Sequence, residues 1–227
     1  MVACRILSHH SAPFQDRVEA GQLLGRELAE LRGQRAVVLG IPRGGVIVAR
    51  EVARALGGDL DIVLSRKLGA PGNPEFAIGA VGEDGRVFVS ESTLGWLRLS
   101  PGYLDREAER QRAEIARRIQ LYRSVRPKVP LEGRPVIVTD DGVATGATMQ
   151  AALWAARQER PSRLIAALPV GPEEALTRLA EGADELVCLQ APDPFQAVSQ
   201  FYSFFDQTDD AELVELLREE AERSQEP

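Results

Sequence analysis

Residues 136–148 read Val-Ile-Val-Thr-Asp-Asp-Gly-Val-Ala-Thr-Gly-Ala-Thr. An apolar strand is followed by two adjacent carboxylates and then by small residues, and a helix is predicted to begin at Thr148. Small residues allow the backbone to wrap closely around an anion, and a helix N-terminus offers free N–H groups. Carboxylates suit hydroxyl groups or a magnesium shell. The segment therefore predicts a ligand with a phosphate at one end and vicinal hydroxyls nearby, such as ribose 5-phosphate.

The same residues also allow a plainer interpretation. Asp140 or Asp141 would cap the following helix, and the glycines would only turn the chain between a strand and that helix. Small-residue turns of this kind are common when they stand alone. The full arrangement of buried strand, paired carboxylates and small loop favours the ligand-binding interpretation.

Alternating apolar runs and turn residues predict strands and helices on both sides of this segment. Strands are expected over 36–40, 61–65, 134–139, 164–168 and 186–189, and helices over 16–33, 46–56, 103–122, 148–158, 172–180 and 208–223. A hairpin is expected from 77–81 to 86–90, and an irregular, mobile loop over 66–74. This order predicts an α/β fold with a mainly parallel sheet flanked by helices, with ligands bound at the turns 41–45, 66–75 and 140–148.

The segment 136–148 resembles the motif by which type I phosphoribosyltransferases bind 5-phosphoribosyl diphosphate (PRPP). That motif is an apolar strand, two acidic residues and a small loop that ends in Thr-Gly-x-Thr. The resemblance implies that Asp140 and Asp141 contact the ribose hydroxyls. It also implies that the 5′-phosphate lies against Ala144, Thr145, Gly146, Ala147 and Thr148.

Two other turns carry the resemblance further. Gly40-Ile-Pro-Arg-Gly-Gly45 resembles the family's diphosphate loop, so Arg43, Gly44 and Gly45 are implied to face the diphosphate. Arg66 and Lys67 follow the second strand, where the family often carries basic residues that bind diphosphate. The chain as a whole resembles a bacterial subgroup with Pro-Arg-Gly-Gly, Arg-Lys-x-Gly-Ala-Pro-x-Asn-Pro-Glu and Asp-Asp-Gly-x-Ala-Thr-Gly motifs.

The implied fold is the type I phosphoribosyltransferase fold in a single domain spanning 1–227. Its core is expected over about 14–190. A small hood subdomain is expected from the N-terminal segment and about 191–207, followed by a C-terminal helix over about 208–224.

The implied activity is transfer of a 5-phosphoribosyl group from PRPP to a nitrogen heterocycle such as a nucleobase, with Mg²⁺ present and diphosphate released. Arg43 and Lys67 would be the catalytic cations that neutralise the departing diphosphate. Asp140 and Asp141 would hold Mg²⁺ directly or through water. The alternative is a regulatory protein that binds PRPP without turnover. A hydrolase is disfavoured because the motif offers no evident base to activate water.

The second substrate is not named by the motif. Hypoxanthine-guanine members carry an aspartate where this chain has Ala144, so a 6-oxopurine acceptor loses support. Glu75 would be a loop carboxylate near the site or a residue that faces solvent. The aromatic residues between Phe195 and Phe205 would stack on an acceptor or, more commonly for such clusters, close a small core under the hood.

The net charge and the residue composition limit the classes of partner that the chain is expected to bind. The net charge of −7 argues against DNA binding, and no apolar run is long enough to span a membrane. Cys4 and Cys188 form no CxxC pair, and no signal peptide is evident, which favours a reducing, cytoplasmic setting. His9 and His10 are expected to precede the first regular element and to have no functional role. The expected partners are PRPP and a small-molecule acceptor, and a homodimer is left open.

Overall fold

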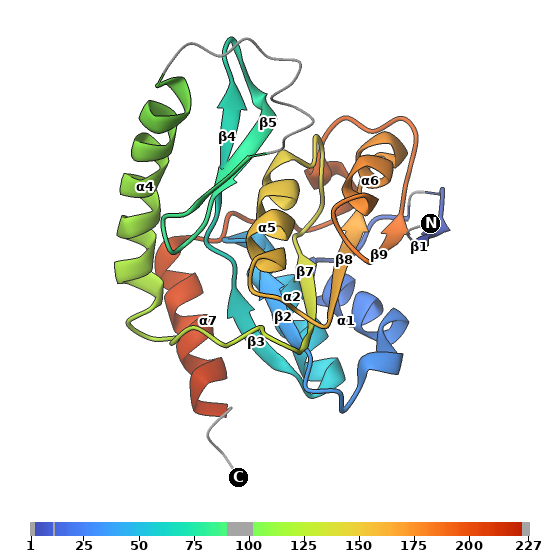
Figure 1. Ribbon diagram of the computed structural model, residues 1–227. Helices are drawn as coiled ribbons and strands as arrows, with labels where there is room; N and C mark the ends of the chain where they lie inside the picture. The colour runs from blue at the N-terminus through green and yellow to red at the C-terminus, as the bar shows by residue number, and fades with distance from the viewer. Residues whose placement is uncertain (1–2, 11, 90–101, 224–227) are drawn as a thin grey trace.

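The computed structural model describes residues 3–10, 12–89 and 102–223, apart from the side chains of Pro74 and Glu75. A six-stranded sheet lies at its centre, in the order β1-β9-β8-β7-β2-β3 (Figure 1). Every neighbouring pair in it is parallel. The strands are β1 (Ala3–Ser8), β2 (Val37–Gly40), β3 (Asp59–Ile62), β7 (Pro135–Thr139), β8 (Arg163–Val170) and β9 (Glu185–Gln190).

Helices cover both faces of this sheet, because its strands are apolar on both sides. Val38 and Ile137 belong to a core shared with one set of helices, whereas their neighbours Val37 and Val136 belong to a second core with the other set. The first set is α1 (Arg17–Glu27), the short 3₁₀ helix η1 (Ala29–Leu31), α2 (Gly44–Leu56) and α7 (Asp210–Arg223); the second is α5 (Ala147–Arg157) and α6 (Glu173–Ala180). The α/β fold with a parallel sheet is therefore confirmed.

A second, smaller sheet occupies the region where an irregular loop was expected over 66–74. Strands β4 (Arg66–Ala70), β5 (Asn73–Val81) and β6 (Val87–Val89) form an antiparallel sheet. The loop prediction was wrong because the Gly and Pro residues mark a tight turn, in which Gly72 has a φ of +75°. The predicted hairpin around Gly82–Gly85 is confirmed as β5 and β6, with Gly82 N–H donating to the Arg86 carbonyl at 3.0 Å.

Helix α4 (Tyr103–Tyr122) closes this smaller sheet and has the bounds that the sequence predicted. Its apolar residues Ala108 and Ile115 share a third core with Leu68 and Ile78. Figure 1 shows α4 beside the β4–β5 hairpin, with α7 near its other end. The charged helix α4 therefore packs against the smaller sheet along one apolar stripe.

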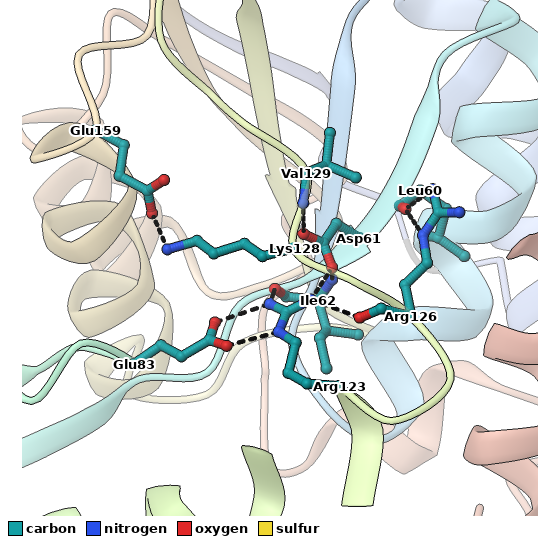
Figure 2. A network of polar contacts seen from close by, with 9 residues as sticks. All are labelled: Leu60, Asp61, Ile62, Glu83, Arg123, Arg126, Lys128, Val129 and Glu159. Carbon is teal, nitrogen blue, oxygen red and sulfur yellow. Dashed lines mark hydrogen bonds and ion pairs between the residues drawn. The ribbon is translucent and has the colours of Figure 1, made fainter. Parts of the chain in front are cut away.

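A network of charged groups ties the end of α4 to the central sheet (Figure 2). Arg123 follows α4 and donates to Asp61 of β3 at 2.5 Å and to both oxygens of Glu83 at 2.6 and 2.8 Å. Asp61 is 1% exposed and also accepts the N–H of Val129 at 2.8 Å. Burial raises the pKa of Asp61, and Arg123 opposes that shift. Because Glu83 lies in the β5–β6 turn, one arginine joins both sheets.

The N-terminal segment was expected in the hood, but residues 3–8 form strand β1 and pair with β9 at the edge of the central sheet. His9 and His10 therefore follow the first regular element. Two parts of the segment also contact the residues after β9: the Ala191 N–H donates to the Ser8 carbonyl at 2.8 Å, and the Phe14 N–H donates to the Phe201 carbonyl at 2.9 Å. The 3₁₀ helix η2 (Val198–Phe201) lies in this same stretch. Within the described residues, no helix has the length and apolar character needed to cross a bilayer.

Candidate functional site

Two turns meet where neighbouring strands β2 and β7 end. Gly40 and Thr139 are register partners in the parallel pair, so residues 41–45 and 140–148 leave the same edge of the sheet. The Ile41 N–H donates to the Thr139 carbonyl at 3.0 Å. The two segments that the sequence proposed for diphosphate and for ribose phosphate are thus adjacent. This edge is where ligands bind in open parallel sheets.

Gly44 and Gly45 are needed because the two turns touch. A Cβ on Gly45 would lie 2.7 Å from both the Cα and Oδ1 of Asp140. A Cβ on Gly44 would lie 2.7 Å from the Arg17 Nε and closer still to the Asp141 carboxylate. Side chains larger than hydrogen therefore clash at both positions. The sequence interpreted these glycines as backbone that faces the ligand, and the structure adds that they make room for the carboxylates.

Asp141 is held from behind by Arg17, at the start of α1. The Arg17 Nε donates to Asp141 Oδ2 at 2.8 Å, and the Arg17 Nη1 donates to the Asp206 carbonyl at 2.8 Å. The Arg17 guanidinium lies 3.9 Å from the centre of the Phe205 ring. Both charged side chains of this pair are largely buried. One of the two carboxylates is therefore already bound to a cation of the protein itself.

The Asp141 backbone is fixed as well, because the Tyr202 hydroxyl donates to its carbonyl at 2.5 Å. The sequence did not mark Arg17 as a site residue, and it offered Tyr202 only as one of the aromatic residues that would stack on an acceptor or close a small core. Arg17 lies 124 residues from Asp141 in the chain, and it looks like a polar residue of an amphipathic helix. No local pattern marks such a partner.

Asp140 is the carboxylate that faces open space. It lines a cavity of about 270 Å³ together with Ile41, Pro42, Arg66, Arg118 and Thr148. Its Oδ1 accepts the Asp141 N–H at 2.8 Å. Burial, followed by the negative charge of Asp141, raises the pKa of Asp140 well above its usual value, and Arg17 offsets part of the shift. The pKa of Asp141 is also raised by burial, while Arg17 lowers it.

These raised pKa values predict that Asp140→Asn makes the protein more stable at pH 7. In the wild type, the folded state holds the proton more tightly than the unfolded state, so the cost of burying the charge accumulates as pH rises from the unfolded-state pKa to the folded-state pKa. The asparagine removes that cost, which amounts to about 1.4 kcal/mol for each unit by which the pKa is raised. Urea unfolding at pH 7 and at pH 4 measures the gain.

The gain from Asp140→Asn should shrink towards zero as pH falls to the pKa of an unfolded aspartate, about 3.9. A variant that is less stable than the wild type at pH 7 would contradict the prediction. Such a result would mean that the charged carboxylate makes stabilising contacts that outweigh its burial.

The half of the turn that was predicted to bind phosphate is partly exposed. Ala144, Thr145 and Thr148 are exposed, whereas Gly146 and Ala147 are buried beneath them. Gly146, the residue before α5, has no side chain that could cap the N-terminus of this helix. Thr145 Oγ1 lies at 3.5 Å from the Ala147 nitrogen, which is at the limit of a hydrogen bond. The first turn of α5 therefore presents N–H groups and two hydroxyls to an anion.

The model of the phosphoribosyl transferase domain family matches residues 18–203. The chain belongs to this family. The match includes both turns and most of the central sheet, so the predicted fold and family are confirmed together.

Three relatives of this phosphoribosyl transferase domain are informative. Proteins from two strains of Mycobacterium tuberculosis, provisionally described as phosphoribosyl transferases, are each 44% identical over 204 residues, or 90% of this chain and 46% of their own length. The chain thus spans about half the length of these curated relatives. A crystal structure of the protein TT1426 from Thermus thermophilus is 50% identical, with a TM-score of 0.86, and the match covers 92% of this chain and 99% of that one.

The predicted diphosphate residues of the phosphoribosyl transferase domain lie in three different settings. Arg66 lines the 270 Å³ cavity and also a neighbouring cavity of about 490 Å³, which Lys67 lines too. Arg66 Nε donates to Gln111 Oε1 of α4 at 3.0 Å. Arg43 is not brought into contact with these two: its Nη1 lies 3.7 Å from Asp210 Oδ1 at the start of α7. Its side chain would have to turn from Asp210 to meet a ligand in the cavity.

The aromatic cluster between Phe195 and Phe205 has mixed surroundings. Phe201 and Tyr202 are buried in the core that the central sheet shares with α1, α2 and α7. The ring centres of Phe195 and Phe201 lie 5.0 Å apart. Phe204 is 63% exposed. Most of this cluster therefore closes a core beneath residues 191–207, while Phe205 packs on Arg17. The question left open for Glu75 concerns a side chain outside the described residues.

Proposed function

We propose that this domain transfers a 5-phosphoribosyl group from PRPP to a nitrogen nucleophile. The nitrogen would attack C1 of the ribose, the C1–O bond would break, and diphosphate would leave with the bonding electrons. The observation that carries the proposal is the cavity at the ends of β2 and β7. It brings Asp140, Arg66 and Thr148 together beside the N-terminus of α5, where the backbone N–H groups are open to a ligand.

Each half of the cavity suits one part of PRPP. Asp140 would accept hydrogen bonds from the ribose hydroxyls, since an ionised carboxylate is an acceptor only. Thr145, Thr148 and the first N–H groups of α5 would hold the 5′-phosphate. Asp141 would act through its backbone and through Arg17, which keeps it in place. As positive charge builds on the sugar, Asp140 would favour it electrostatically.

Magnesium fits this site only in part. Among the described residues, no group of three or more His, Cys, Asp and Glu side chains is placed to hold a metal ion. Asp141 is neutralised by Arg17, which leaves Asp140 as the carboxylate that faces the cavity. Mg²⁺ typically keeps several waters and uses one or two carboxylates plus substrate phosphates. When bound, it would neutralise diphosphate charge, with Asp140 as its contact to the protein, directly or through water.

The acceptor is proposed to be a nitrogen heterocycle. The exposed apolar Ala144 supplies no carboxylate beside the ribose, so this side of the site offers no general base from the motif. Residues 191–207 lie next to the site through the Tyr202 contact with Asp141. They are the described residues best placed to form a hood over the acceptor.

Turnover tests the proposal directly. The protein would be incubated with PRPP, Mg²⁺ and a panel of purine and pyrimidine bases, and release of diphosphate would be followed. Diphosphate release that depends on one base is expected. Asp140→Asn should lower kcat/KM by about 10–100-fold, because a charge-assisted hydrogen bond to the ribose is worth about 1.5–3 kcal/mol.

A measurement of PRPP binding distinguishes a transferase from the alternative, a regulatory protein that binds PRPP without turnover. Tight PRPP binding without turnover on any base would contradict the transferase and would favour a regulator that only binds PRPP. Absence of PRPP binding would contradict both. The Asp140→Asn comparison is sound because the variant is expected to be stably folded, so lost activity would report on the site.

A further inference from the structure

Arg118 lines the cavity but lies outside the segment 136–148 that defines the family. It comes from α4, the charged helix that the sequence predicted over 103–122. In the structure Arg118 lines the same 270 Å³ cavity as Pro42, Arg66 and Asp140. Its side chain is 23% exposed, whereas that of the preceding Arg117 is 55% exposed. Successive residues of one helix thus face different surroundings.

The hydrogen bond of Arg118 orients its guanidinium and leaves other N–H donors available. Its Nε donates to Glu114 Oε1 at 2.9 Å, four residues earlier on α4. A guanidinium carries five N–H donors in a rigid fork, so one hydrogen bond to Glu114 leaves further donors to meet a ligand. The Glu114 carboxylate also accepts from Arg117, which lowers its pKa to about 2 and keeps it ionised. The side chain of Arg118 is therefore oriented in advance.

Positive charge is concentrated at this end of the cavity. Burial lowers the pKa of Arg66, and the positive charges of Arg118 and Arg110 lower it further, while Glu114 acts in the opposite sense. Like charges brought together in a partly buried place repel one another. An anion bound between Arg66 and Arg118 would remove that repulsion and accept their hydrogen bonds.

We propose that Arg118 binds the diphosphate of PRPP, together with Arg66, from the α4 side of the cavity. This inference rests on the proposed function and assigns the leaving group a contact outside the three ligand turns. Diphosphate is the favoured anion because Ile41 and Pro42 of the turn 41–45 line this cavity. The 5′-phosphate would instead lie over residues 144–148.

The test uses binding of inorganic diphosphate with Mg²⁺ to the full chain, measured by calorimetry at one fixed salt concentration. Arg118→Gln is expected to weaken diphosphate binding by about tenfold or more, as for loss of a charge-assisted hydrogen bond. Arg117→Gln is the matched control, since it removes the same charge from the preceding residue of α4, which has the same partner Glu114. It should change the affinity by less than about threefold.

Ribose 5-phosphate provides a second readout. Because it lacks the diphosphate, its affinity should be nearly equal in the wild type and in Arg118→Gln. Arg118→Lys keeps the charge but loses the rigid fork, and it should show an intermediate loss for diphosphate. It also serves as the deciding variant if Arg118→Gln does not fold.

The outcomes distinguish this inference from the proposed function. If the wild type binds PRPP and both Arg118 variants bind diphosphate as the wild type does, the assignment of Arg118 is wrong and the proposed function stands. An equal loss of affinity in the Arg117 and Arg118 variants would likewise overturn it, since the effect would be one of general charge. A wild type that binds neither PRPP nor diphosphate would overturn both.

Discussion

Replacing Arg123 with methionine is expected to lower the free energy of unfolding by about 3–5 kcal/mol at pH 7. The change leaves Asp61 as a buried carboxylate without its cation and releases Glu83. The two N–H groups that Asp61 accepts from Val129 and Ile62 remain, but they do not replace a full positive charge. Urea unfolding followed by circular dichroism measures the loss.

The loss in Arg123→Met should depend on pH with a definite sign. Burial already raises the folded-state pKa of Asp61, and removal of Arg123 raises it further. The destabilisation should therefore be largest at neutral pH and shrink as pH falls through that raised pKa, where the carboxyl becomes neutral in the folded state.

A surface arginine provides the control for Arg123→Met. Arg178 pairs with Glu174 on α6, and its side chain is 54% exposed. Arg178→Met should cost no more than about 0.5 kcal/mol. Adding Asp61→Asn to Arg123→Met should recover part of the stability, because the unpaired charge is gone. Equal losses at Arg123 and Arg178 would contradict a buried network that joins the two sheets.

Arg17→Met is the second change with a large expected effect. It leaves the buried Asp141 carboxylate beside Asp140 without its cation, so a loss of about 3–5 kcal/mol in the free energy of unfolding is expected. PRPP affinity should also fall, because the turn 140–148 loses the contact that fixes the Asp141 carboxylate. Thermal unfolding and PRPP calorimetry, performed on the same samples, measure the two effects.

A double substitution identifies the cause of the Arg17→Met effect. Arg17→Met with Asp141→Asn removes both charges and should be more stable than Arg17→Met alone by more than about 1 kcal/mol. If the double variant is no more stable than the single one, the arginine acts through its packing on Phe205 and its hydrogen bond to the Asp206 carbonyl. That result would refute the charge-pair explanation.

The central sheet and the strand–turn–helix segment around 140–148 could be predicted because their signals are local. Buried parallel strands are continuous apolar runs, and the turn after β7 has its carboxylates, small residues and helix start in consecutive positions, 140–148. Helix α4 could be placed because twenty residues without Gly or Pro favour one helix. These features need no knowledge of distant contacts.

The features that the sequence did not predict depend on distant contacts. Strand β1 is mostly exposed at the edge of the sheet, so its pattern is weak, and its pairing with β9 joins opposite ends of the chain. Arg17, Arg118 and Arg123 look alike in the sequence, as arginines in or beside polar helices. Their roles depend on which carboxylate or cavity the folded chain brings to them. Arg43 is the opposite case: its sequence motif was recognised, but its ion-pair partner Asp210 could not be predicted.

The contact between Gly44–Gly45 and Asp140–Asp141 also has a consequence for evolution. Because even a methyl group on either glycine would collide with the carboxylates or with Arg17, the two turns cannot diverge independently. A lineage that accepts a larger residue at position 45 must first displace the backbone at position 140, which would reshape the site. A larger residue at position 44 or 45 should therefore be accompanied, among related chains, by a change at position 140 or 141 or at Arg17.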